Sequence, residues 1–209
     1  EPTVEARGSL LAALAHGPRL ERFLHGGQGP ITRVATDPGG LHFAAGTRGG
    51  RVVLWDADSG EELAGSPLEL AGAVELSVAI SADGRWLAAG GPLADDPSQG
   101  RLGLWDLTAR PPRPASPDGP PNPGGRVNDL GFCGAGERAT LAWTTKREVK
   151  LWRRGSQPAT VLERVPVRGL AWAPDCGCLA AGHERDGGVS LVGVGEAGCP
   201  SRTLEGPLG

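Results

Sequence analysis

Short apolar runs alternate with polar positions along most of the chain, in a pattern typical of β-strands. In residues 51–56, apolar side chains follow the polar Arg51 and end at the large residue Trp55. Two similar runs precede it, at residues 34–36 and at the small-residue triplet 44–46, with a Gly-bearing turn after each. Strands of this length, joined by tight turns, predict one small antiparallel sheet rather than helices.

The same unit occurs four times. The large residues that end its third strand are 50, 47 and 40 residues apart, and they are Trp55, Trp105, Trp152 and Val192. Repeats of this length predict stacked sheets, because packing one sheet against the next buries both of its faces. The chain therefore divides into four predicted four-stranded blades, at about residues 31–66, 74–116, 126–163 and 166–206.

The ends of these third strands resemble the WD-repeat β-propeller family. The Trp-Asp dipeptide is intact at residues 55–56 and 105–106 and is half kept at 152–153. The resemblance covers roughly residues 20–206 and implies an all-β propeller of WD-repeat type with four degenerate blades. The family's Gly-His dipeptide is missing from its expected places, so its Asp-His-Ser-Trp hydrogen-bond tetrad is incomplete. We interpret as structural repeat anchors the residues Trp55, Asp56, Trp105, Asp106 and Trp152.

The first residues break this pattern. Residues 4–14 place three Leu side chains on one face, which predicts a short N-terminal helix ended by a Gly-Pro pair. We expect residues 1–19 to form this helix and a linker, and residues 20–209 to form the propeller blades. We also expect residues 20–26 to add an outer strand that closes the ring, with residues 201–205 as an apparent C-terminal counterpart.

A second resemblance concerns residues 9–25. This segment is similar to the linker before the C-terminal WD repeats of bacterial STAND-type (NACHT-like) signalling ATPases. The resemblance implies a sensor region whose contact with a partner releases the ATPase for signalling. No phosphate-binding Gly-x-x-x-x-Gly-Lys-Ser/Thr motif occurs in the chain, and Met is absent, so we expect a piece of a longer or processed protein.

Four blades are fewer than WD-type rings usually contain. We therefore expect a partial ring or a small propeller. Closure by four blades, pairing of two copies, and completion by missing sequence all remain open.

The second blade carries two insertions, at residues 91–100 and at 111–125. The latter has Pro at every third position from 111 to 123, which predicts a stiff exposed linker or, alternatively, a docking motif.

Composition argues against several classes of function. The net charge is −3, and no run of 18 apolar residues occurs, so the sequence predicts no general affinity for nucleic acid and no membrane span. Four cysteines in 209 residues do not predict a disulfide framework and favour a reduced, cytoplasmic protein. The alternative is a redox or disulfide role in which Cys176 and Cys178 act together with Cys199. The four His residues lack metal-ligand spacing, and no nucleophile motif is present, so we predict no catalytic, cofactor or metal site.

The resulting hypothesis is a non-enzymatic module for protein–protein interaction or sensing, whose loops bind a protein partner of unknown identity. The predicted contacts are Arg33, Arg48, Asp95 and Arg185. The alternatives are a ligand-binding or enzyme-type propeller with a central pocket, and a purely structural scaffold.

Overall fold

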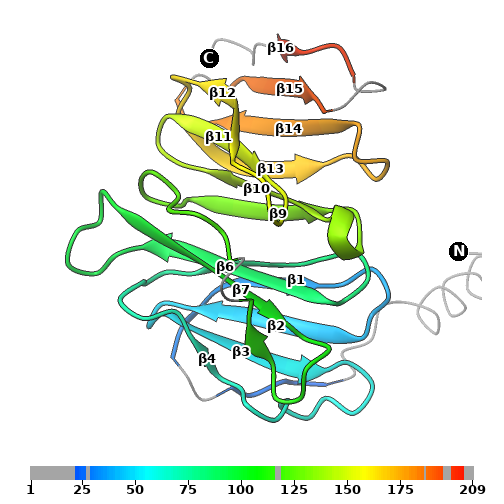
Figure 1. Ribbon diagram of the computed structural model, residues 1–209. Helices are drawn as coiled ribbons and strands as arrows, with labels where there is room; N and C mark the ends of the chain where they lie inside the picture. Colours follow the sequence, from blue (N-terminus) through cyan, green and yellow to red (C-terminus); the bar gives the residue numbers. More distant parts are fainter. Residues whose placement is uncertain (1–21, 27–28, 116–118, 186, 195–198, 205–209) are drawn as a thin grey trace, which may run out of the picture.

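The computed structural model describes residues 22–26, 29–115, 119–185, 187–194 and 199–204. Within these residues the protein is all-β and consists of four four-stranded antiparallel sheets stacked face to face (Figure 1). The one helical element there is a single 3₁₀ turn, η1 (Gly136–Arg138). The fold class predicted from the repeat is thus confirmed as a four-blade propeller, whereas the predicted N-terminal helix over residues 4–14 lies outside the described residues.

Each blade uses four consecutive strands that pair in chain order. Blade one contains β1 (Ile31–Thr36), β2 (His42–Thr47), β3 (Arg51–Asp56) and β4 (Leu68–Glu69). Blade two contains β5 (Ser77–Ile80), β6 (Trp86–Pro92), β7 (Gly100–Asp106) and β8 (Arg113–Pro114). Blade three contains β9 (Asp129–Cys133), β10 (Thr140–Thr144), β11 (Glu148–Trp152) and β12 (Ala159–Glu163). Blade four contains β13 (Val167–Trp172), β14 (Cys178–His183), β15 (Val189–Gly193) and β16 (Arg202–Leu204).

The strand register gives every blade two distinct faces. In blade one, Val34 pairs with Ala45 and Ala45 with Val53, so these side chains share what we call the leading face. Their neighbours Ala44 and Leu54 pair with each other on the opposite, trailing face. The alternation of apolar residues in the sequence therefore supplies both faces of a blade, because successive side chains point to opposite sides.

Trailing faces pack against leading faces at the three junctions between blades. Leu54 of blade one shares a buried cluster with Val78 of blade two. Leu104 of blade two packs in the same way with Leu130 of blade three, and Val149 of blade three with Val192 of blade four. The hydrophobic core is therefore three similar layers of aliphatic and Trp side chains rather than one central core.

The third repeat is aligned one residue later than the sequence pattern predicts. The sequence pattern matches residues 141–143 to the Ala-Ala-Gly triplet of the other blades. In the structure Leu141 pairs with Trp152, as Phe43 pairs with Trp55, so the equivalent triplet is 142–144. A one-residue shift exchanges the two faces of a strand, and the corrected register puts Trp143 on the leading face, where it is fully buried.

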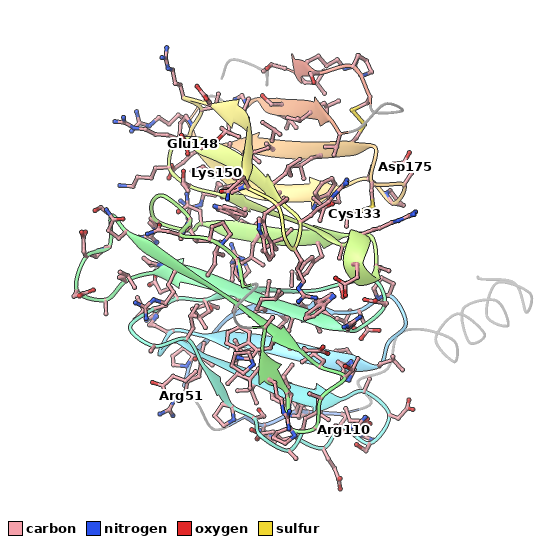
Figure 2. The ribbon with its side chains drawn as sticks, in the orientation of Figure 1. Arg51, Arg110, Cys133, Glu148, Lys150 and Asp175 are labelled. Carbon is pink, nitrogen blue, oxygen red and sulfur yellow. A yellow bond between two sulfur atoms is a disulfide. The ribbon has the colours of Figure 1, made fainter. Side chains whose placement is uncertain are left out.

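All four cysteines form disulfides, so the expectation of reduced thiols is wrong. Cys133, at the end of β9, is bonded to Cys176 in the β13–β14 turn, and Cys178 is bonded to Cys199 within blade four. Figure 2 shows Cys133 beside the turn that carries Asp175. Stacking of blades three and four brings Cys133 to Cys176, which the Cys-x-Cys spacing could not indicate. The bond of Cys178 with Cys199 agrees with the disulfide alternative that the sequence left open. Cysteine content therefore gives no support for a reducing cytoplasm.

The expected closing strand over residues 20–26 is also not found, since the described part of it, residues 22–26, contains no strand. There Leu24 packs instead against Ala45, Val53 and Trp55 on the leading face of blade one. The predicted C-terminal counterpart does form a strand, β16, but it is the fourth strand of blade four.

The Pro-rich insertion differs in part from an exposed linker. Residues 113–114 form the short outer strand β8, paired with the end of β7. Farther along, Pro123 is buried, and its carbonyl oxygen accepts hydrogen bonds from the Trp143 indole N–H (3.3 Å) and from Lys150 Nζ (3.4 Å). The insertion thus packs back onto blade three.

Candidate functional site

A hollow of about 570 Å³ lies where the first strands of the blades begin, and we call it the funnel. It receives side chains from all four blades, from the strand starts and from the turns β2–β3, β10–β11 and β14–β15. Its lining residues are Ile31, Thr32, Arg33, Arg48, Glu75, Ser77, Arg126, Val127, Asn128, Lys146, Arg168 and Glu184. In Figure 2 this end of the blades is the left-hand edge, where Arg51 and Glu148 are labelled.

Positive charge predominates in the funnel. Five of its lining residues are Arg or Lys and two are Glu, which leaves a formal charge of +3 in a chain whose net charge is −3. Both glutamates are paired, Glu75 with Arg126 at 3.4 Å and Glu184 with Arg168 at 3.1 Å. The other three cations, Arg33, Arg48 and Lys146, have no carboxylate partner among the described residues. The funnel is therefore locally cationic, with cations that are free to bind an incoming anion.

Two short turns explain why cationic side chains lie at the funnel. Arg48 and Lys146 lie in tight turns, the first closed by a hydrogen bond from Gly50 N–H to the Thr47 carbonyl and the second by one from Thr145 N–H to the Glu148 carbonyl. Gly50 has φ +81°, a conformation that favours glycine. Both turns are short, so they hold the bases of these side chains on rigid strand ends.

Register shifts near the start of β1 and β13 direct two further side chains toward the funnel. The register shifts between Ile31 and Arg33 in blade one and between Val167 and Gly169 in blade four. Bulges re-aim side chains near strand ends. The residues at these two shifts, Thr32 and Arg168, both line the funnel. The Thr32 hydroxyl also donates to the Leu76 carbonyl of blade two at 2.6 Å, which ties the funnel wall of one blade to the next.

Two of the four predicted contact residues, Arg33 and Arg48, line the funnel. Asp95 lies in the exposed β6–β7 hairpin, where it is not part of the lining, and Arg185 is exposed beside Glu184 in the β14–β15 turn. The sequence reasoning missed Arg126, Lys146 and Arg168. Lys146 occupies the position of Arg48, so placing the repeats in register could have found it. Arg126 and Arg168 fall at the positions of Pro30 and Thr32 in blade one, so the repeat gives no signal for them.

The structure places the predicted repeat anchors at the ends of the third strands. Trp55, Trp105 and Trp152 are buried between blades or against residues 22–26. Asp56 accepts a hydrogen bond from Ser59 N–H (2.8 Å), and this bond, with that from the Ser59 hydroxyl, lowers the pKa of Asp56. Burial raises the pKa of Asp106, but its hydrogen bonds with Thr108 and the nearby Arg85 outweigh burial and lower it.

Two kinds of reactive group can be compared with the described residues: a metal site and an activated nucleophile. No group of three or more His, Cys, Asp or Glu side chains in this part of the chain is placed to hold a metal ion. Two hydroxyls line the funnel: that of Ser77 donates a hydrogen bond to Asp129 Oδ1 (3.0 Å), and that of Thr32 donates to the Leu76 carbonyl. No His lines the hollow to act as a base for either. Nor does any helix in the described residues have the length and apolar character needed to cross a membrane.

Comparison with known proteins agrees with this architecture. Residues 18–56 match the family model described as "WD domain, G-beta repeat". The solved structure titled "Structure of U3-55K" is similar to this chain with a TM-score of 0.66 at 20% sequence identity, over 92% of this chain and 57% of that one. No curated protein matches. The family match and the likeness in fold support a WD-repeat propeller, and the chain spans little more than half the length of the similar structure.

Proposed function

We propose that this chain is a non-enzymatic module for protein–protein interaction and that the funnel is its recognition surface. The observation that carries the proposal is the meeting of side chains from four blades around one hollow. Loops held on a rigid scaffold commonly carry binding residues. The family likeness supports this role, because WD-repeat propellers generally bind proteins.

The charge of the funnel favours an acidic segment of a protein partner. Complementary charge speeds encounter and sets the register of a bound chain. Arg48 and Lys146 supply exposed cations from blades one and three, while the ion pairs of Glu75 and Glu184 leave the two carboxylates already neutralised. A nucleic acid is less well matched, because no aromatic side chain lines the funnel to stack on a base.

A small-molecule pocket is the weaker interpretation of the same hollow. Its volume lies within the range of ligand pockets, but such pockets are lined mostly by apolar and aromatic side chains. Only Ile31 and Val127 are large apolar residues in the funnel lining. The lining therefore fits a solvated polar chain better than a compact apolar ligand.

We infer the larger protein to which this chain belongs from the resemblance of residues 9–25 to the linker of STAND-type ATPases. In that setting the chain is the sensor region of a bacterial signalling protein, and partner binding at the funnel releases the ATPase. The motif lies mostly outside the described residues, so the proposal for the parent protein stands on sequence resemblance alone.

Binding of a short fluorescein-labelled Asp/Glu peptide, followed by anisotropy at low salt, tests the function. We expect saturable binding that weakens as salt rises and at least about tenfold weaker binding for the double variant Arg48→Glu/Lys146→Glu. Arg113→Glu/Arg138→Glu is the matched control with the same change in net charge, since both residues are exposed and neither lines the funnel. An equal loss in both variants, or tighter binding of an oligothymidylate than of the peptide, contradicts the proposal.

A further inference from the structure

Part of the leading face of blade one is exposed, although the equivalent positions in the blades that follow are buried. Val34 is 75% exposed, whereas its equivalents Val78 and Leu130 are each 5% exposed. Phe43 is 39% exposed, whereas its equivalents Leu87, Leu141 and Leu179 are completely buried. In the inner blades this burial comes from the trailing face of the preceding blade. Blade one has no preceding blade in the described chain, and it presents an apolar face to solvent.

A second hollow marks this face. It has a volume of about 430 Å³, and its walls are mostly apolar side chains that include Ile31, Val34, Phe43 and Trp55. Leu24 covers only the part near Trp55 and Val53. Large exposed apolar patches on a folded protein commonly mark interaction sites, and here the patch is the repeat-equivalent of a blade junction.

The opposite end of the stack carries the complementary face. On the trailing face of blade four, Ala180 pairs with Leu191, and both are partly exposed. Their equivalents in blade one, Ala44 and Leu54, are almost completely buried against blade two. Blades one and four lie at opposite ends of the stack, so the chain cannot close these two faces on each other (Figure 1).

We propose that a second copy of this chain covers both faces and completes the ring. All three junctions within the chain join a trailing to a leading face, so a partner that continues the stack at blade one presents a trailing face. The chain itself carries an uncovered one. A two-fold pair seats blade four of each copy on blade one of the other, and this arrangement closes without leaving a free end. The result is a ring with two equivalent junctions between copies, continuous with the junctions already present in each.

Sedimentation velocity of the chain across a concentration series tests this pairing. We expect a species of twice the 21.4 kDa chain mass that dissociates on dilution. Val34→Lys and Leu191→Asp should each give a monomer, because each substitution places a charge at both junctions of the pair. Residues equivalent to these two share one buried cluster at the first junction, as Val78 and Leu54.

Mixing the two variants separates pairing from misfolding. The mixture forms one unaltered junction and one in which the introduced charges are opposite, so we expect the dimer to return when the two monomers are combined. Val34→Ile is the matched control and should leave the dimer intact. A wild-type chain that remains monomeric at high micromolar concentration overturns the proposal, as does a mixture that stays monomeric while each variant keeps the wild-type circular dichroism spectrum.

Discussion

The carboxylate of Asp129 accepts a hydrogen bond from the main-chain N–H of Leu170, with 2.9 Å between Oδ2 and N. Asp129 belongs to β9 of blade three, and Leu170 to β13 of blade four. The other carboxylate oxygen, Oδ1, accepts from the Ser77 hydroxyl of blade two at 3.0 Å. One side chain at the start of an inner strand thus links three blades near the wall of the funnel.

We expect Asp129→Ala to lower the free energy of unfolding by roughly 2 kcal/mol, because hydrogen bonds to a charged group are stronger than neutral ones and the Leu170 N–H loses its partner. Urea denaturation followed by Trp fluorescence measures this change. Asp58→Ala is the control, since Asp58 is an exposed turn residue. Equal stability of the two variants would show that the link between blades contributes nothing.

The disulfide between Cys133 and Cys176 should stabilise the contact of blades three and four. It closes a loop of 43 residues, and the chain-entropy model assigns such a loop about 4 kcal/mol. We expect the double variant Cys133→Ser/Cys176→Ser to unfold at clearly lower urea concentration than the oxidised wild type. Adding reductant to the wild type should lower the midpoint further still, because it also opens the bond of Cys178 and Cys199.

The control for this experiment is Cys178→Ser/Cys199→Ser. Its disulfide spans 21 residues within one blade, so the smaller loop predicts a smaller loss, about 3 kcal/mol. Free-thiol titration of the native wild-type protein should find none of the four cysteines reactive. Four reactive thiols, with no change in midpoint on reduction, would exclude both bonds.

Asp83 should make stability depend on pH in the acid range. Its Oδ2 accepts from Gly136 N–H of blade three at 2.7 Å. Burial raises the pKa of Asp83, but the hydrogen bonds from the Ser81 hydroxyl and from the Gly136 and Arg85 N–H groups outweigh burial and hold the pKa below its usual 3.8. A carboxyl with a lowered pKa stabilises the folded state above its unfolded pKa, and this stabilisation disappears as pH falls through the folded pKa.

For Asp83→Asn we therefore expect a lower Tm than wild type at neutral pH and a shallower fall in Tm below about pH 4. Thermal unfolding followed by circular dichroism between neutral and acid pH measures both effects. Asp58→Asn removes one exposed carboxylate without these bonds and serves as the matched control. Parallel curves for wild type and Asp83→Asn would contradict the assignment.

The fold could be predicted because its information is local and repeated. Each third strand ends in Trp or Val at a similar spacing, and the alternation in residues 51–56 already separates two faces. The register of the third repeat could not be predicted, since the sequence pattern allows the small-residue triplet to begin at either Leu141 or Ala142. Pairing of Leu141 with Trp152 decides it, and that is a contact between strands.

The funnel could be predicted only in part, because it is assembled from residues far apart in the chain. Arg48 lies in the β2–β3 turn, where loop position was enough to select it, whereas Arg33, predicted as a loop residue, belongs to strand β1 of the same blade. Arg126 and Arg168 reach the same hollow from blades three and four, which depends on how the blades stack. The disulfide of Cys133 and Cys176 escaped prediction for the same reason.

A matched pair of substitutions tests the two-faced blade directly. Val34 and Val78 occupy equivalent positions on leading faces, but only Val78 is covered, by the trailing face of blade one. We expect Val78→Ala to lower the free energy of unfolding by roughly 2 kcal/mol through the cavity it leaves, and Val34→Ala to change it by less than about 0.5 kcal/mol in dilute solution. At protein concentrations where two copies pair, the Val34→Ala chain should become less stable than wild type, because its face is then buried as well. Urea midpoints measured at low and at high protein concentration separate these cases, and equal losses for both variants in dilute solution would refute the assignment of an uncovered face to blade one.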